Sequence, residues 1–143
     1  MGQTRRLIEA SPERIFAVLS DPDAYAHWVV GSDIIRDADP GWPAAGTRFY
    51  HRVGWGPIKI KDHTEVLAVE PPHRLELRAK ARPLGTAYVA LELAPRGAGT
   101  LVTMTEDAGD RATRLLFNPL THLLVRGRNA ESLRRLEELA RRH

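Results

Sequence analysis

The stretch of sequence that decides the fold is the last one, which reads Asp110-Arg-Ala-Thr-Arg-Leu-Leu-Phe-Asn-Pro-Leu-Thr-His-Leu-Leu-Val-Arg-Gly-Arg-Asn-Ala-Glu-Ser-Leu-Arg-Arg-Leu-Glu-Glu-Leu-Ala-Arg-Arg-His143. Its apolar residues recur at spacings of three and four, which places them along one side of a helix. The residues of this stripe are Leu116, Leu120, Leu123, Leu124, Leu133, Leu136 and Ala140. A helix with so long a stripe needs a broad apolar surface to cover it.

The start of this helix is marked by Asn118 and Pro119. Asparagine is a good N-cap, and proline fits the first turn because the N–H that it lacks would have no partner there. Two interpretations remain open: the helix begins at Asn118, or Pro119 kinks a longer helix that Asp110 caps. From Asn118 to Arg141 the helix would be about 36 Å long at ~1.5 Å per residue, enough to cross a small domain.

The apolar partner of the helix is a sheet, because the hydrophobic pattern between residues 33 and 106 alternates and is interrupted by turn residues. The expected strands span residues 5–9, 34–36, 47–54, 58–70, 75–79, 87–93 and 100–106. Short hairpin-like turns such as Gly54-Trp-Gly-Pro57 join them, so the sheet should be antiparallel with one face on the core. The apolar parity slips within residues 58–70, which predicts a bulge or a strong twist near Asp62-His63-Thr64.

Two short helices are predicted between the first and second strands. Ser11-Pro12-Glu13 combines an N-cap, a proline in the first turn and an acid near the positive end of the helix. Asp21-Pro22-Asp23 repeats this start signal, and the second helix carries Tyr25 and Trp28. Helices and strands are segregated along the chain, which is the α+β pattern. We expect one domain over residues 1–143, in which a curved antiparallel sheet of six to seven strands wraps around the long C-terminal helix.

The composition is that of an ordinary globular domain. Of the 143 residues, 43% are hydrophobic and 27% are charged. The chain has no cysteine, which excludes a disulfide framework, a thiolate zinc site and a cysteine nucleophile. No apolar run reaches the roughly 18 residues of a transmembrane segment, and residues 1–6 lack the apolar block of a signal peptide. We therefore expect a cytoplasmic protein.

The charge is mildly positive. The net charge of +3 results from 21 basic and 18 acidic residues, and most charged runs mix the two signs. The arginines of the last helix are Arg126, Arg128, Arg134, Arg135, Arg141 and Arg142, with Glu131, Glu137 and Glu138 among them. We interpret them as a solvated face whose cations favour the C-terminal end of the helix dipole. The strands lack clustered surface aromatics for base stacking, so no nucleic-acid partner is expected.

Three segments carry a resemblance to a known family. They are Ala10-Ser-Pro-Glu-Arg-Ile-Phe-Ala-Val-Leu-Ser-Asp-Pro-Asp-Ala-Tyr-Ala-His-Trp28, Thr64-Glu-Val-Leu-Ala-Val-Glu-Pro-Pro-His-Arg-Leu75 and Leu93-Ala-Pro-Arg-Gly-Ala-Gly-Thr-Leu-Val-Thr103. The chain resembles, essentially over its whole length, the START-like (SRPBCC) superfamily with its Bet v 1-like helix-grip fold. More narrowly it resembles the polyketide cyclase/dehydrase and lipid-transport group.

This resemblance implies a sheet and a long helix that enclose an apolar cavity. Members of the superfamily bind lipids, sterols, quinones, polyketides or plant metabolites, and some are aromatase/cyclases. No single catalytic motif spans the group, so no catalytic residue is carried over from it. The resemblance places Trp28 near the end of the second short helix, beside the expected cavity.

The candidate ligand contacts are residues that the pattern places on the inner side of the sheet or on the helices that meet it. They are Tyr25, Trp28, Phe49, His51, Tyr88, Met104, Leu120 and Leu123. His51 shares a strand face with Phe49, where a neutral imidazole either lines the wall or acts as an acid or base. Glu106 is expected either on the inner face of the last strand, where its carboxylate needs a partner, or at the end of the sheet, where it reaches water. His51 and Glu106 are weak catalytic candidates. The pattern does not decide which face of its strand His63 occupies, because His63 lies where the parity slips.

Three functional hypotheses follow. The first is binding or carriage of a small hydrophobic or amphipathic ligand, such as a lipid, polyketide or quinone. The second is an aromatase/cyclase or dehydratase enzyme, which needs a histidine and an acid that converge. The third is a protein- or ribosome-interacting, quinone-handling relative that docks through its arginine-rich helix.

Further expectations concern the ligand entrance, metals and assembly. Trp42 and Trp55 lie in predicted loops, where they could form the lip of a pocket. The six histidines lack the spacing of a metal site, so neither a metal nor a cofactor is expected. We expect a monomer or a weak homodimer.

Overall fold

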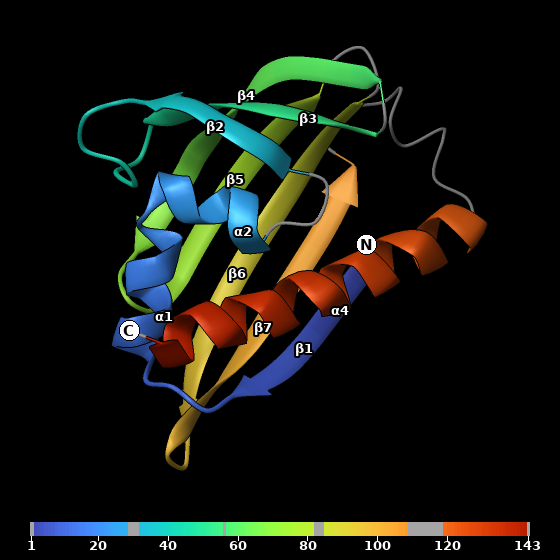
Figure 1. Cartoon of the computed structure of the whole chain (residues 1–143). Coiled ribbons are helices and arrows are strands. Elements are labelled where there is room, and N and C mark those ends of the chain that lie inside the picture. The colour runs from blue at the N-terminus through green and yellow to red at the C-terminus, as the bar shows by residue number, and fades with distance from the viewer. Residues whose placement is uncertain (1, 29–31, 56, 82–84, 109–118, 143) are drawn as a thin grey trace.

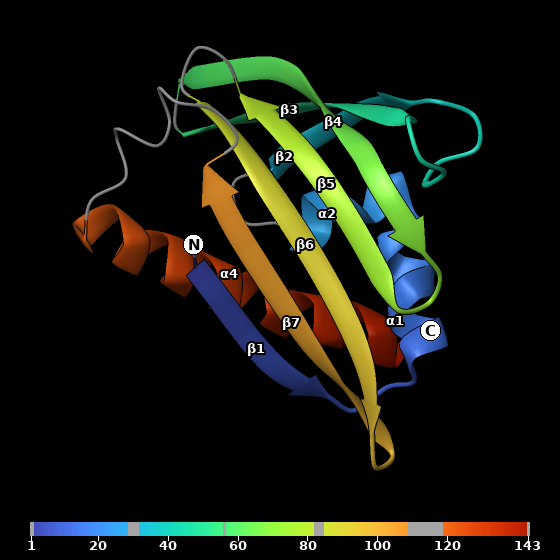
Figure 2. The ribbon, with the colours of Figure 1, turned by 180° about the vertical axis from the view of Figure 1, so that it is seen from behind.

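The computed structural model describes residues 2–28, 32–55, 57–81, 85–108 and 119–142. Within these residues, seven strands form one antiparallel sheet in the order β1-β7-β6-β5-β4-β3-β2 (Figures 1 and 2). The strands are β1 (Gly2–Ile8), β2 (Ser32–Ala38), β3 (Arg48–Trp55), β4 (Ile58–Glu70), β5 (Arg74–Ala81), β6 (Gly85–Arg96) and β7 (Gly99–Ala108). The predicted α+β, helix-grip architecture is confirmed.

The helices gather on one face of the sheet, which we call the inner face (Figures 1 and 2). They are α1 (Pro12–Leu19), the 3₁₀ helix η1 (Pro22–Ala24), α2 (Tyr25–Trp28) and α4 (Pro119–Arg142). The long helix α4 contacts β1, α1 and α2. None of the helices in the described part of the chain is both long and apolar enough to span a membrane.

The start signals of the two short helical segments work as predicted. The Ser11 hydroxyl accepts a hydrogen bond from the Arg14 N–H at 3.2 Å, and Pro12 occupies the first turn of α1. The Asp21 carboxylate accepts one from the Asp23 N–H at 3.1 Å and caps η1. These short caps satisfy backbone N–H groups that a helix start leaves without partners.

The apolar stripe of α4 is buried in its described half. Leu133, Leu136 and Ala140 have no solvent exposure and pack into the core beneath the sheet. The described helix begins at Pro119. Asn118 lies outside the described residues, as do the side chains of Leu120 and Leu123, so the interpretation of the helix start remains a prediction.

The predicted irregularity of β4 exists, but its position was wrong. The pairing of β3 with β4 is regular through Asp62, His63 and Thr64. The register shifts instead between Val66 and Ala68, where β4 pairs with β5. The shift lies in the uninterrupted apolar run of residues 66–69, which tolerates a change of face, so both Val66 and Val69 contact the core.

Candidate functional site

An aromatic cluster lies on the inner face where α2 meets β3. The Tyr25 ring lies 5.0 Å from Trp28 and 4.6 Å from Phe49, measured between ring centroids. Trp42 reaches in from the loop between β2 and β3 and meets Phe49 edge-on at 4.7 Å. The His51 ring extends the cluster along β3, 5.6 Å from Phe49. Trp42 therefore has a core contact that the sequence pattern did not reveal.

Burial gives this cluster a neutral, apolar character. Tyr25, Trp28 and Phe49 are each at most 3% exposed. The Tyr25 hydroxyl donates to the Leu19 carbonyl at 3.2 Å, and burial raises the pKa of Tyr25 well above its usual range. The indole N–H groups of Trp28 and Trp42 are buried without a hydrogen-bond acceptor among the described residues. Donors in that position favour an acceptor atom brought by a bound molecule.

A polar pair adjoins the aromatic cluster. His51 on β3 and Asp62 on β4 stand directly opposite each other in the antiparallel register. They are 4% and 7% exposed, and each lies two residues from another buried residue of the inner face, Phe49 for His51 and Thr64 for Asp62. The next inward pair along the hairpin, Phe49 and Thr64, is equally buried. The imidazole and the carboxylate, with the Thr64 hydroxyl beside them, are thus polar groups that border the aromatic cluster.

His63, whose face was left open, belongs to the outer face. It stands opposite Tyr50, and the two rings lie 6.1 Å apart. The Asp62 Oδ1 atom accepts the His63 backbone N–H at 2.9 Å and lies 3.4 Å from His63 Nδ1. Asp62 is therefore fixed by the backbone of its own strand.

Glu106 is on the inner face and has the partner that its burial requires. It is 7% exposed, and Arg128 of α4 donates through Nη2 to its two carboxylate oxygens at 2.6 and 2.5 Å. The same nitrogen lies 3.4 Å from Asn129 Oδ1. Three strands separate β7 from β3, so Glu106 is not the carboxylate beside His51. Asp62 takes that place, which the hydrophobic pattern of the sequence did not indicate.

Of the other expected contacts, one is on the inner face and one is not. Met104 is 4% exposed and faces Leu91 across the β6–β7 ladder within the core. Tyr88 lies on the outer face, because it alternates with the inward Val89 and Leu91. Its hydroxyl donates to Glu76 Oε1 at 2.7 Å, next to Arg74. The expectation that Tyr88 lies close to the ligand site was wrong.

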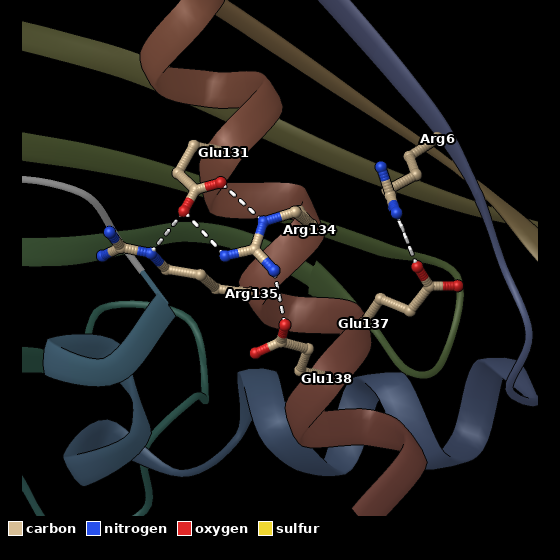
Figure 3. Close-up of polar contacts among 6 residues, drawn as sticks. All are labelled: Arg6, Glu131, Arg134, Arg135, Glu137 and Glu138. Atoms are coloured by element: carbon tan, nitrogen blue, oxygen red, sulfur yellow. Dashed lines mark hydrogen bonds and ion pairs between the residues drawn. The ribbon is translucent and has the colours of Figure 1, made fainter.

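Two arginines of α4, Arg134 and Arg135, are bound to carboxylates of the same helix (Figure 3). Arg134 pairs with Glu131 at 2.6 Å and with Glu138, and Arg135 pairs with Glu131 at 3.0 Å. Hydrogen bonds from Arg134 and then Arg135 lower the pKa of Glu131 to about 2. These cations are thus largely neutralised by acids of the same helix.

A second set of contacts ties α4 to β1. Glu137 accepts from Arg6 of β1 at 2.8 Å (Figure 3). It also accepts from the backbone N–H of Glu9, directly after β1, at 3.1 Å. Burial opposes the charge of Glu137, yet the hydrogen bonds from Arg6 and Glu9 leave its pKa below the usual range. Among the described side chains, no group of three or more histidines and acids is arranged to hold a metal ion.

The comparisons with known proteins agree with this architecture. The family model described as polyketide cyclase/dehydrase and lipid transport matches residues 3–141. The search of curated proteins found no significant match.

Three solved structures show the likeness of fold. The chain is similar to protein NE0264 from Nitrosomonas europaea, with 20% identity, a TM-score of 0.73, and coverage of 99% of this chain and 94% of that one. It is similar to a protein from Rhodobacter sphaeroides, with 24% identity, a TM-score of 0.75, and coverage of 96% and 89%. It is also similar to Ara h 8.0201, with 12% identity, a TM-score of 0.72, and coverage of 99% and 97%.

Proposed function

Because the chain belongs to the polyketide cyclase/dehydrase and lipid-transport family, we propose that it binds a small apolar or amphipathic molecule against the inner face of its sheet. The observation that carries the proposal is the buried cluster of Tyr25, Trp28, Trp42 and Phe49. Aromatic rings offer large apolar contact area, and their edges and faces suit a flat or unsaturated guest. Ligand pockets are usually lined by apolar and aromatic side chains with a few polar groups among them.

The proposed contacts come from three elements. Tyr25 and Trp28 belong to α2, Phe49 and His51 to β3, and Met104 to β7. Trp28, Phe49, His51 and Met104 lie on the inner face, which is the side of the sheet where α4 lies. The periodicity of the sequence places Leu120 and Leu123 on the apolar side of α4. Tyr88 is not part of the proposed site, since its hydroxyl is engaged on the outer face.

The buried indole donors support a guest with a polar atom rather than a pure hydrocarbon. Trp28 Nε1 and Trp42 Nε1 would each gain from an acceptor oxygen, because a buried N–H without an acceptor costs free energy. Lipids, polyketides and quinones all carry such oxygens. The contacts therefore favour an apolar body with at least one oxygen.

Docking through the arginine-rich helix has less support. Arg128, Arg134, Arg135 and Arg141 each lie within 4 Å of a carboxylate, so the charge that a partner would meet is reduced. The pattern fits a solvated helix face.

Native mass spectrometry of freshly purified protein tests the proposal first. We expect a fraction of the protein to carry an additional non-covalent mass that organic solvent releases as an apolar compound. A titration with the neutral fluorophore N-phenyl-1-naphthylamine tests it independently. Saturable binding is expected, and Phe49→Ala should weaken it several-fold, whereas Tyr88→Phe on the outer face should leave it unchanged. A protein that carries no compound and does not bind the fluorophore would refute the proposal.

A further inference from the structure

We propose that the guest carries a hydroxyl group, and that this hydroxyl is bound by the pair formed by His51 and Asp62. The inference rests on the proposed function, since it concerns the same inner face. It adds Asp62 to the proposed binding residues and narrows the ligand to apolar molecules with a phenolic, enolic or alcoholic O–H.

The placement of the pair carries the first step. His51 and Asp62 are directly opposite residues of one hairpin, and the side chains of such pairs begin about 4.5–5.5 Å apart at Cβ. The β3–β4 ladder is regular from Arg48 and Glu65 to Trp55 and Ile58, so the two groups are held by continuous pairing. A polar group that reaches one of them is within reach of the other.

The chemistry of the two groups carries the second step. A carboxylate only accepts hydrogen bonds, whereas a neutral imidazole has one donor and one acceptor nitrogen. A hydroxyl can donate to Asp62 while it accepts from His51, so a single oxygen can bind both groups. A carboxylate on the guest would meet the like charge of Asp62, and a hydroxyl keeps the guest neutral in a buried place.

The neighbouring rings carry the third step, because they fix where the apolar body lies. His51 is 5.6 Å from Phe49, and Phe49 contacts Tyr25 and Trp42. A hydroxyl bound at His51 and Asp62 therefore places the carbon skeleton of the guest along the aromatic cluster. The polar pair acts as an anchor at one end of an apolar wall.

Two probes of nearly equal size separate the hydroxyl from the apolar body. They are 1-naphthol and 1-methylnaphthalene, whose affinities are measured by titration calorimetry. Hydrogen bonds to charged groups lead us to expect that the wild-type protein binds 1-naphthol about 10- to 100-fold more tightly. In His51→Phe and Asp62→Asn this ratio should fall to about one to three, with the affinity for 1-methylnaphthalene almost unchanged.

The control is Tyr88→Phe, which removes a hydroxyl from the outer face and should keep the wild-type ratio. If Asp62→Asn does not fold, His51→Phe carries the test, since it preserves an aromatic ring at the position. A wild-type ratio near one, or a ratio that survives in the variants, overturns the inference and leaves the proposed function standing. Binding of neither probe would count against the proposed function itself for aromatic guests, and against the inference with it.

Discussion

The ion pair between Glu106 and Arg128 provides the sharpest test of how the sheet holds α4. The two groups differ in burial, because the Glu106 side chain is 6% exposed and the Arg128 side chain is 39% exposed. Arg128→Met therefore leaves a carboxylate in a place where water has little access. Glu106→Gln leaves an arginine that still reaches water. We expect the first change to destabilise the protein clearly more than the second.

The magnitude follows from this asymmetry. Removal of one partner from a fully buried pair costs about 3–5 kcal/mol. Because the arginine is more than a third exposed, we discount this to roughly 2–3 kcal/mol for Arg128→Met. Glu106→Gln should cost about 1 kcal/mol, since an amide still accepts a hydrogen bond. The double variant should be more stable than Arg128→Met alone, because the uncompensated buried charge is then absent.

Urea denaturation followed by circular dichroism measures these differences, and a thermal scan checks them. At ~2–4 °C per kcal/mol for a domain of this size, Arg128→Met should lower the melting temperature by roughly 4–12 °C. Arg134→Met is the matched control, because it makes the same exchange on the same helix at two exposed pairs, in which Arg134 is 46% exposed and its partners Glu131 and Glu138 are 36% and 50% exposed. Exposed pairs of this kind contribute little to stability, because water screens them. The reasoning is refuted if Arg128→Met costs no more than Arg134→Met, or if the double variant is the least stable.

Three further predictions concern single groups. Tyr25 should ionise only on unfolding in an alkaline absorbance titration, because burial raises its pKa. Its contribution to stability is intact below pH 10.0 and is lost as the pH rises beyond that value. Reversible ionisation of all three tyrosines in the folded protein would contradict this prediction. Glu131 should titrate near pH 2 in a carbon-detected NMR experiment, so its contribution to stability is complete above pH 4.5 and disappears as the pH falls through about 2. A midpoint near 4.5 at low salt would show that Arg134 and Arg135 do not lower its pKa. Gly99→Ala should destabilise the protein by about 1–3 kcal/mol in urea, because the new Cβ would lie 2.5 Å from the Ile8 carbonyl oxygen, whereas Gly2→Ala, with its nearest atom at 3.9 Å, should be close to neutral; equal effects would refute the steric argument.

The parts of the fold that the sequence predicts well depend on neighbouring residues. The caps at Ser11 and Asp21 are formed by side chains that bond the backbone two or three residues ahead. Period alone places Phe49 and His51 on one face of β3, and it places Leu133 on the buried side of α4. Such features need no knowledge of which strands meet.

Features that depend on strand partners were predicted less well. The bulge lies at Val66 and Ala68, where β4 leaves regular pairing with β5, and a hydrophobic pattern cannot distinguish that place from one four residues earlier. Tyr88 was expected on the inner side of the sheet, although it is the direct neighbour of Val89, which faces inward, and therefore points the other way. On a strand with one inner face, alternation determines the side and residue type does not.

The place of Asp62 beside His51 was not predicted for a different reason, because it depends on the length of the turn between β3 and β4. Trp55 pairs with Ile58, and four residues back along β3 and four forward along β4 bring His51 opposite Asp62. The sequence offers the whole of Gly54-Trp-Gly-Pro57 as a connection. With all four residues in the loop, the register would shift by two, and His51 would stand opposite Ile60. Both registers keep the same residues on the inner face, so the hydrophobic pattern accepts either one. The chemistry differs, since one register gives the imidazole a carboxylate neighbour and the other an apolar one.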